Sequence, residues 1–158
     1  MLYKLLVDTW GQSGFIDWLW HLSLQYRTRL CIMVEQCRMH LPAELCSWSE
    51  PEYGMFLWVK IRWAMHPKAV DLCYGGSAAA ARLDIEDCIY IKAQEYGVQL
   101  SKGSWFAVQD EPGDPIFVRL TFAAVAHEDD LHEAIRQLGR ALRAEFAMIG
   151  GRQASCQL

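Results

Sequence analysis

The sequence predicts an α+β fold, in which helices cover a small three-stranded sheet. Long segments whose apolar residues recur every three or four positions alternate with short segments whose apolar residues occur at every second position. The order is helix, strand, helix, strand, strand, helix. Because only a short turn separates the last two strands, they should pair antiparallel. A chain of 158 residues suits one domain of this kind.

The first helix is the longest predicted element. Ser13 is a suitable N-cap, and Pro42 ends the helix because the residue before a proline avoids the helical region. Trp18 and Trp20 lie away from the main apolar face, so the aromatic residues near the start of the helix are too numerous for one buried face. That face comprises Phe15, Leu19, Leu22, Tyr26, Leu30, Met33, Cys37 and Leu41.

The remaining elements follow from side-chain alternation and from capping residues. Asp84 is expected to cap the second helix, and Gly97 to end it. In chain order, we expect a strand over 54–63, a loop over 64–83, a helix over 85–96, a strand over 98–100, a turn over 101–106, a strand over 117–124 and a helix over 127–151.

The composition argues against several classes of function. The formal net charge is -4 and the 15 Lys and Arg residues are scattered, which disfavours a nucleic-acid-binding surface. No apolar stretch reaches the ~18 residues of a membrane span, and the N-terminal segment lacks a signal-peptide cleavage site. The six cysteines form no C-x-x-C pair and have no histidine at zinc-ligand spacing. We therefore expect reduced structural cysteines, no metal site and a cytoplasmic protein.

Arg119 is the residue that stands out as a candidate for binding. Motifs for dinucleotides, phosphates or a serine nucleophile do not occur, whereas Arg119 lies within the otherwise apolar segment PIFVRLTFAA (115–124). In a strand, Phe117, Arg119 and Thr121 share one side. Two interpretations stay open from these residues alone. Arg119 is either an edge-strand arginine paired with a surface carboxylate, or a guanidinium that binds a ligand carboxylate through two parallel hydrogen bonds.

A set of longer segments, taken in order, resembles a known family. The segments are WGQSGFIDWLWHLSLQYRTR, LPAE, SWSEPEYGMFLWVKI, HP, DIEDCIYIKAQEYGVQLSKGSWF, FVRLTFAA and EAIRQLGRAL. Over residues 8–148 they resemble the C-terminal small domain of fold-type-I aminotransferases dependent on pyridoxal phosphate, in the fungal form of the aromatic amino acid or 2-aminoadipate branch. The resemblance divides the chain into an N-terminal linker (1–12), the small domain (13–149) and a flexible tail (150–158).

The resemblance implies an activity and a role for several residues. It implies a pyridoxal-phosphate enzyme, homodimeric, that transfers an amino group from an aromatic or related amino acid to a 2-oxo acid. Arg119 matches the family arginine that binds the substrate α-carboxylate, and Gly54, Ser104 and Phe106 match segments that wall the site. The match departs at Lys102, where the family often has a proline that would fix φ before Gly103.

The resemblance also implies that the reaction centre lies elsewhere. In the family a large domain supplies the lysine that binds the cofactor covalently, and none of Lys4, Lys60, Lys68, Lys92 and Lys102 stands in such a context. We therefore expect no catalytic, cofactor-binding or metal-binding residue in these 158 residues, no covalent binding of pyridoxal phosphate, and no transamination by them alone.

The excess of aromatic residues has a candidate cause in this resemblance. A small domain packs against a large domain and a partner subunit, so apolar side chains such as Trp10, Trp18, Trp20 and Phe56 are candidates for an exposed aromatic face. The alternative is that all four are core residues. Three hypotheses remain: part of a truncated or split aminotransferase, a non-catalytic protein-interaction module that keeps the fold, and a binder of small carboxylates.

Overall fold

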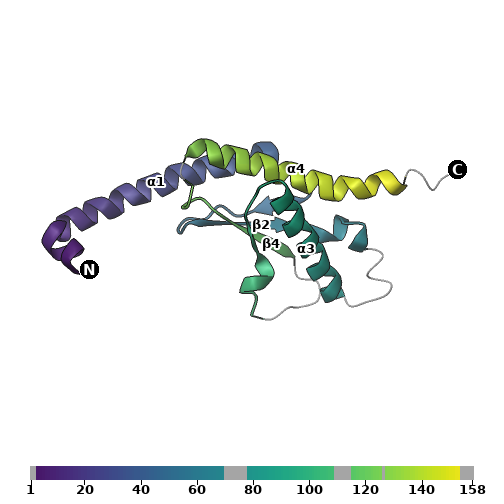
Figure 1. The fold of residues 1–158 in the computed structure, drawn as a ribbon, viewed down its shortest axis with the longest axis horizontal. Helices are drawn as coiled ribbons and strands as arrows, with labels where there is room; N and C mark the ends of the chain where they lie inside the picture. The colour runs from purple at the N-terminus through teal and green to yellow at the C-terminus, as the bar shows by residue number, and fades with distance from the viewer. Residues whose placement is uncertain (1–2, 70–77, 109–114, 126, 154–158) are drawn as a thin grey trace.

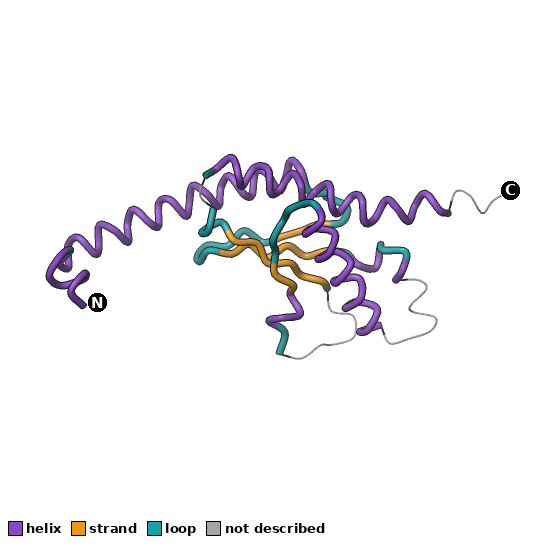
Figure 2. The backbone as a smooth tube through the Cα atoms, viewed as in Figure 1, coloured by secondary structure: helices purple, strands orange, loops and turns teal. Residues whose placement is uncertain are grey.

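The computed structural model describes residues 3–69, 78–108, 115–125 and 127–153. It is an α+β structure in which helices lie against one side of a four-stranded antiparallel sheet (Figures 1 and 2). The strands stand in the order β1-β2-β4-β3. In chain order the elements are η1 (Lys4–Thr9), α1 (Gly11–His40), β1 (Cys46–Trp48), β2 (Phe56–Ile61), η2 (Trp63–Met65), α3 (Ala78–Glu95), β3 (Ser101–Lys102), η3 (Gly103–Phe106), β4 (Ile116–Thr121) and α4 (Glu128–Gln153).

The sheet separates an apolar face from a mixed face, because side chains alternate along each strand. On β2 and β4 the residues that face the helices are completely or almost completely buried: Leu57, Val59, Ile61, Ile116, Val118 and Leu120. Their neighbours in sequence point to the opposite face. The register places Arg119 of β4 between Trp58 of β2 and Ser101 of β3. Arg119 therefore lies in a central strand and not at the sheet edge.

Two long helices form most of the layer over the apolar face. Figure 1 shows α1 and α4 side by side, and the last turns of α1 carry its buried residues, including Met33 and Cys37. The helices approach so closely that a Cβ atom added to Gly139 of α4 would lie 2.2 Å from the carbonyl oxygen of His40. Glycine at this position thus permits backbone-to-backbone contact between α1 and α4.

The N-terminal part of α1 extends beyond the sheet (Figure 1). Its side chains are exposed or only partly buried as far as Ile32. Trp20 is 72% exposed and Trp18 is 43% exposed, so the alternative that all four aromatic candidates are core residues is wrong. Ser13 is not the N-cap, because the helix begins at Gly11 and Trp10 precedes it without a side-chain cap.

Other predicted elements need correction. The sheet has four strands and not three, since Cys46–Trp48 pairs with β2 through Cys46 and Ile61. The strand expected over 98–100 is instead Ser101–Lys102. Residues 78–83 are helical, so Asp84 lies inside α3 and caps nothing. The antiparallel pairing of β3 with β4 is confirmed. Residues 70–77 of the loop predicted over 64–83, and residues 154–158 of the tail predicted over 150–158, lie outside the described residues.

Candidate carboxylate-binding site around Arg119

The candidate site lies on the sheet face that the long helices leave uncovered. Phe56 and Trp58 from β2 lie beside Phe117 and Arg119 from β4, because the antiparallel register sets Trp58 opposite Arg119. Trp58 meets Phe117 edge-on, with ring centroids 6.4 Å apart. Large aromatic side chains thus surround one positive charge on an otherwise open face.

The Arg119 guanidinium is held between aromatic rings. Its Cζ atom lies 4.1 Å from the ring centroid of Phe56 and 4.1 Å from that of Phe106, distances at which an arginine stacks favourably on a ring. Its Nη2 donates a long hydrogen bond of 3.4 Å to the Ser101 hydroxyl. Among the residues that the structure describes, no carboxylate forms an ion pair with Arg119. The planar N–H edges are the part of the group suited to a bidentate carboxylate.

The short turn η3 brings Phe106 to Arg119. A Cβ atom added to Gly103 would lie 2.7 Å from the Phe117 carbonyl oxygen and 2.9 Å from the Phe117 Cβ atom, so glycine allows this turn to lie directly on β4. Phe106 then meets Trp58 edge-on, with centroids 5.5 Å apart. The neighbouring Trp105 ring instead packs against Tyr90 of α3, with ring centroids 5.5 Å apart.

Lys102, which stands where the resembled family often has proline, adopts a proline-like backbone. Its φ is −71°, close to the value that a proline ring imposes. The Lys102 ammonium donates to Asp87 Oδ1 at 2.5 Å, and it lies 5.5 Å from the Trp105 ring centroid. An ion pair and a cation–π contact therefore hold the residue before Gly103.

Sequence reasoning missed Glu86, which also contacts the turn. Glu86 is 1% exposed, and its Oε1 accepts the Ser104 backbone N–H at 3.1 Å. The signal in the sequence was a carboxylate between the apolar positions Ile85 and Ile89, on a helix face that should be buried. Of the three residues proposed as walls of the site, Phe106 contacts Arg119, Ser104 contacts Glu86, and Gly54 (φ 96°) lies in the loop that leads into β2.

The lysines do not fit covalent binding of pyridoxal phosphate, which needs a desolvated amine with a lowered pKa. The Cys88 sulfur accepts a hydrogen bond from Lys68 at 3.1 Å and raises the pKa of that ammonium. Glu95 accepts one from Lys92 at 2.6 Å and raises the Lys92 pKa as well. Lys4 and Lys60 are exposed. Within the described part of the chain, no group of three or more His, Cys, Asp or Glu side chains is placed to hold a metal.

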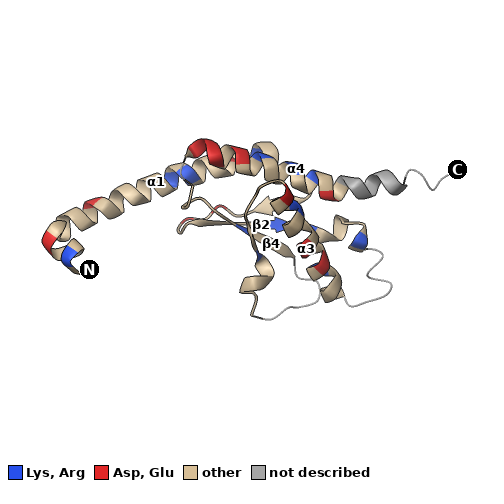
Figure 3. Ribbon diagram, in the orientation of Figure 1, with Lys and Arg blue, Asp and Glu red and all other residues tan. Residues whose placement is uncertain are grey.

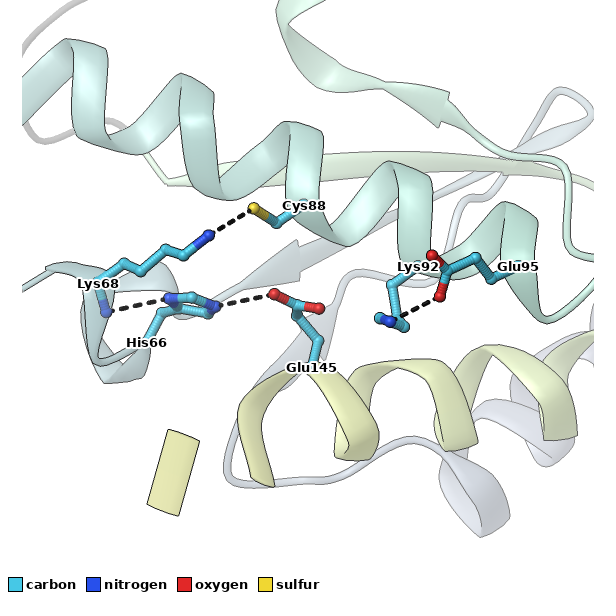
Figure 4. A network of polar contacts seen from close by, with 6 residues as sticks. All are labelled: His66, Lys68, Cys88, Lys92, Glu95 and Glu145. Carbon is cyan, nitrogen blue, oxygen red and sulfur yellow. Dashed lines mark hydrogen bonds and ion pairs between the residues drawn. The ribbon is translucent and has the colours of Figure 1, made fainter. Parts of the chain in front are cut away.

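A second polar cluster lies away from Arg119, between α3, α4 and the loop after η2 (Figure 4). His66 is completely buried; its Nδ1 accepts the Lys68 backbone N–H at 3.3 Å, and its Nε2 faces Glu145 Oε1 at 3.4 Å. Burial lowers the pKa of His66, although Glu145 acts in the opposite direction. Phe146 covers the ring edge-on, so this cluster serves as a packed junction between helices.

Two of the cysteines behave as the sequence predicts for buried thiols. Cys37 and Cys46 are buried, and loss of hydration on burial raises the pKa of each thiol to about 12. Among the described cysteines, Cys31 is exposed and Cys88 is partly buried. In the described ranges, no helix is both long enough and apolar enough to cross a lipid bilayer.

Comparison with known proteins agrees with this architecture. No family model matches the chain. "Aminotransferase swnA" from Arthroderma benhamiae is 47% identical over 146 residues, which cover 92% of this chain and 28% of that protein. The chain is homologous to part of fungal aminotransferases. "Aromatic amino acid aminotransferase C56E4.03" of Schizosaccharomyces pombe is 31% identical over 137 residues, or 87% of the chain and 27% of that protein.

Solved structures give the same result in three dimensions. Aminotransferase Aro8 from Candida albicans matches 92% of this chain with a TM-score of 0.77 and 31% sequence identity, and the match covers 30% of that enzyme. LysN, an α-aminoadipate aminotransferase from Thermus thermophilus, shares the fold with a TM-score of 0.69 at 22% identity. The chain thus spans about 30% of the length of these aminotransferases.

Proposed function

We propose that this chain is the small, C-terminal domain of a pyridoxal-phosphate-dependent aminotransferase and that Arg119 binds the α-carboxylate of the substrate. The observation that supports this role most directly is the geometry of Arg119, stacked between Phe56 and Phe106 with Cζ 4.1 Å from each ring centroid. Rings that cover a guanidinium exclude water from it, so the group is ordered before the ligand arrives. The named aminotransferase relatives support the reaction class, with an aromatic or related amino acid as donor and a 2-oxo acid as acceptor.

The reaction centre belongs to the part of the enzyme outside these residues. Pyridoxal phosphate would supply the electron sink for the chemistry, and this chain would supply only Arg119, which binds the α-carboxylate of the substrate. The 158 residues alone should therefore show no visible absorbance band from bound cofactor that survives desalting, and no transamination. A stoichiometric band that persists and shifts when an amino acid is added would contradict the assignment.

A chimeric enzyme tests the role of Arg119. In the swnA aminotransferase of Arthroderma benhamiae, the matched segment is replaced by this chain, and initial rates are measured against both substrates. Arg119→Gln should raise the KM for the amino acid and for the 2-oxo acid by roughly 10- to 100-fold, because losing a charge-assisted hydrogen bond costs about 1.5–3 kcal/mol. Lys60→Gln is the matched control, since it removes a positive charge from the same sheet face. If Arg119→Gln and Lys60→Gln had equal KM values, the proposed role of Arg119 would be wrong.

The exposed start of α1 should contact the remainder of the enzyme. We define the α1 aromatic surface as Ile16, Trp18, Leu19, Trp20 and Leu24, which are 43–72% exposed. Residues 18–26 contain no Lys, Arg, Asp or Glu, and Figure 3 shows this part of the helix almost without charge. Exposed apolar side chains on an uncharged helix segment of this kind are typical of an interface. We expect it to pack against the large domain and, in a homodimer, near the partner subunit of a cytoplasmic enzyme.

The same surface favours a second candidate, a non-catalytic protein-interaction module that keeps the fold. The two are separated by the chimera combined with light scattering of the chain alone. If the chimera is active and Trp20→Ser in it lowers thermal stability, the surface serves the aminotransferase. If the chimera is inactive while the isolated chain self-associates through Trp20, the interaction module is the better description.

A further inference from the structure

The turn that carries Phe106 is fixed to α3 on both sides of Gly103. Before the glycine, Lys102 pairs with Asp87 at 2.5 Å; after it, the Ser104 N–H donates to Glu86 Oε1 at 3.1 Å. The two carboxylates are adjacent in α3, but their surroundings differ. Asp87 is 54% exposed at its side chain, where an ion pair contributes little, whereas Glu86 is 1% exposed. The contact made by Glu86 is therefore the stronger constraint on the turn.

The burial of Glu86 calls for a physical reason. Its Oε2 atom has no hydrogen-bond partner among the described residues, and a buried carboxyl group that is only half satisfied is unfavourable by itself. An apolar side chain would pack in α3 between Ile85 and Ile89 without this cost. What an apolar side chain cannot do is accept the Ser104 N–H, one of the unpaired donors at the start of η3.

The hydrogen bond from Ser104 to Glu86 affects Phe106, two residues later in the chain. Because η3 is a single short turn, fixing Ser104 also fixes where Phe106 points. The Phe106 ring lies 4.1 Å from Arg119 Cζ and 5.5 Å from the Trp58 ring. A turn released from α3 would remain tied to β4 through Gly103 but would lose the restraint that aims Phe106 at the guanidinium.

We propose that Glu86 is a positioning residue, which holds Phe106 against Arg119 and so orders the guanidinium for its ligand. The functional meaning of this role rests on the proposed function of Arg119. The arrangement itself does not, because it concerns the chain in the absence of substrate. The hydrogen bond from Ser104 to Glu86 thereby connects α3, which takes no part in the sheet, to the ring that lies against Arg119.

The Arg119 Nε–H resonance in the NMR spectrum of the ¹⁵N-labelled chain tests the proposal, because ring currents from Phe106 displace it. Phe106→Leu defines the resonance position without that ring. Glu86→Met keeps a long unbranched side chain in α3 but removes the acceptor, so the resonance should move more than half of the way to the Phe106→Leu position. Glu86→Gln keeps an acceptor at the same reach and should leave the resonance near the original value. Asp87→Asn, the matched control on the same turn of α3, should also leave the resonance near its original value.

A double variant separates positioning from general destabilisation. If Glu86 acts through Phe106, adding Phe106→Leu to Glu86→Met should move the resonance little further. The proposal is overturned if Glu86→Met leaves the Arg119 resonance in place, or if Asp87→Asn moves it as far as Glu86→Met does. It is also overturned if Phe106→Leu shifts the resonance as much in the Glu86→Met background as it does in the parent chain. Should Glu86→Met not fold, Glu86→Asp withdraws the carboxylate by one methylene and is predicted to move the resonance in the same direction. A failure of Arg119→Gln to change KM would refute the carboxylate role and leave this result standing.

Discussion

The close crossing of α1 and α4 makes Gly139→Ala a sharp test of the packing. An alanine Cβ at this position would lie 2.2 Å from the His40 carbonyl oxygen and 3.0 Å from its carbon. Both atoms belong to the backbone, so no side-chain rotation relieves the overlap and the helices must separate. Overpacking of this kind costs roughly 1–3 kcal/mol, and a backbone clash belongs at the upper end. Alanine regains about 1 kcal/mol through its higher helix propensity. The net loss in the free energy of unfolding is therefore about 2 kcal/mol.

Urea denaturation followed by far-UV circular dichroism measures this change. In a thermal melt of the same variant, a loss of about 2 kcal/mol should lower Tm by roughly 4–8 °C for a chain of this length. Gly14→Ala in α1 is the control, because its Cβ would meet only the Trp10 side chain, at 3.3 Å, near the free end of the helix. That variant should be neutral or slightly stabilised. If Gly139→Ala were as stable as the parent chain with an unchanged denaturant slope, the close helix crossing would be wrong.

Two further predictions concern ionisable side chains. Burial lowers the pKa of His66 from 6.5, so the unfolded chain binds the proton more readily; stability should be greatest above pH ~6.5 and fall as the pH drops towards the folded-state pKa. Urea midpoints measured across this range should show that decline, and His66→Gln should flatten it; an equal decline in the variant would assign it to other groups. The raised pKa of about 12 for Cys37 and Cys46 predicts that neither reacts with iodoacetamide in the native chain at pH 8, whereas exposed Cys31 does. Peptide mass spectrometry reads out each site, and rapid labelling of Cys37 would contradict its burial.

The sequence was most informative where the hydrophobic period was strong and the element long. The first and last helices and the strands around Leu57 and Val118 were predicted because burial of one face dictates the spacing of their apolar residues. β1 was missed because a three-residue strand is too short to show alternation. The start of α3 was missed because its run of small residues lacks an apolar stripe.

The candidate site was predictable only in part, for a different reason. Arg119 was identified by its place in an apolar strand and by family resemblance. Phe56 and Phe106, the two rings that touch it, come from elements far apart in sequence, and only strand pairing brings them together. Glu86 contacts the turn through a tertiary hydrogen bond for which no local spacing exists.

Because the N-terminal part of α1 extends beyond the sheet, local stability should differ along this helix. Helices gain most of their stability from tertiary packing, and the first fully buried residue of α1 is Met33. Local opening free energies should therefore form a gradient, small near Gly11 and approaching the global value near Cys37. Amide hydrogen exchange would read that gradient directly. Any binding partner that covers Trp20 would flatten it, so the exchange rates along one helix report whether the chain is alone or assembled.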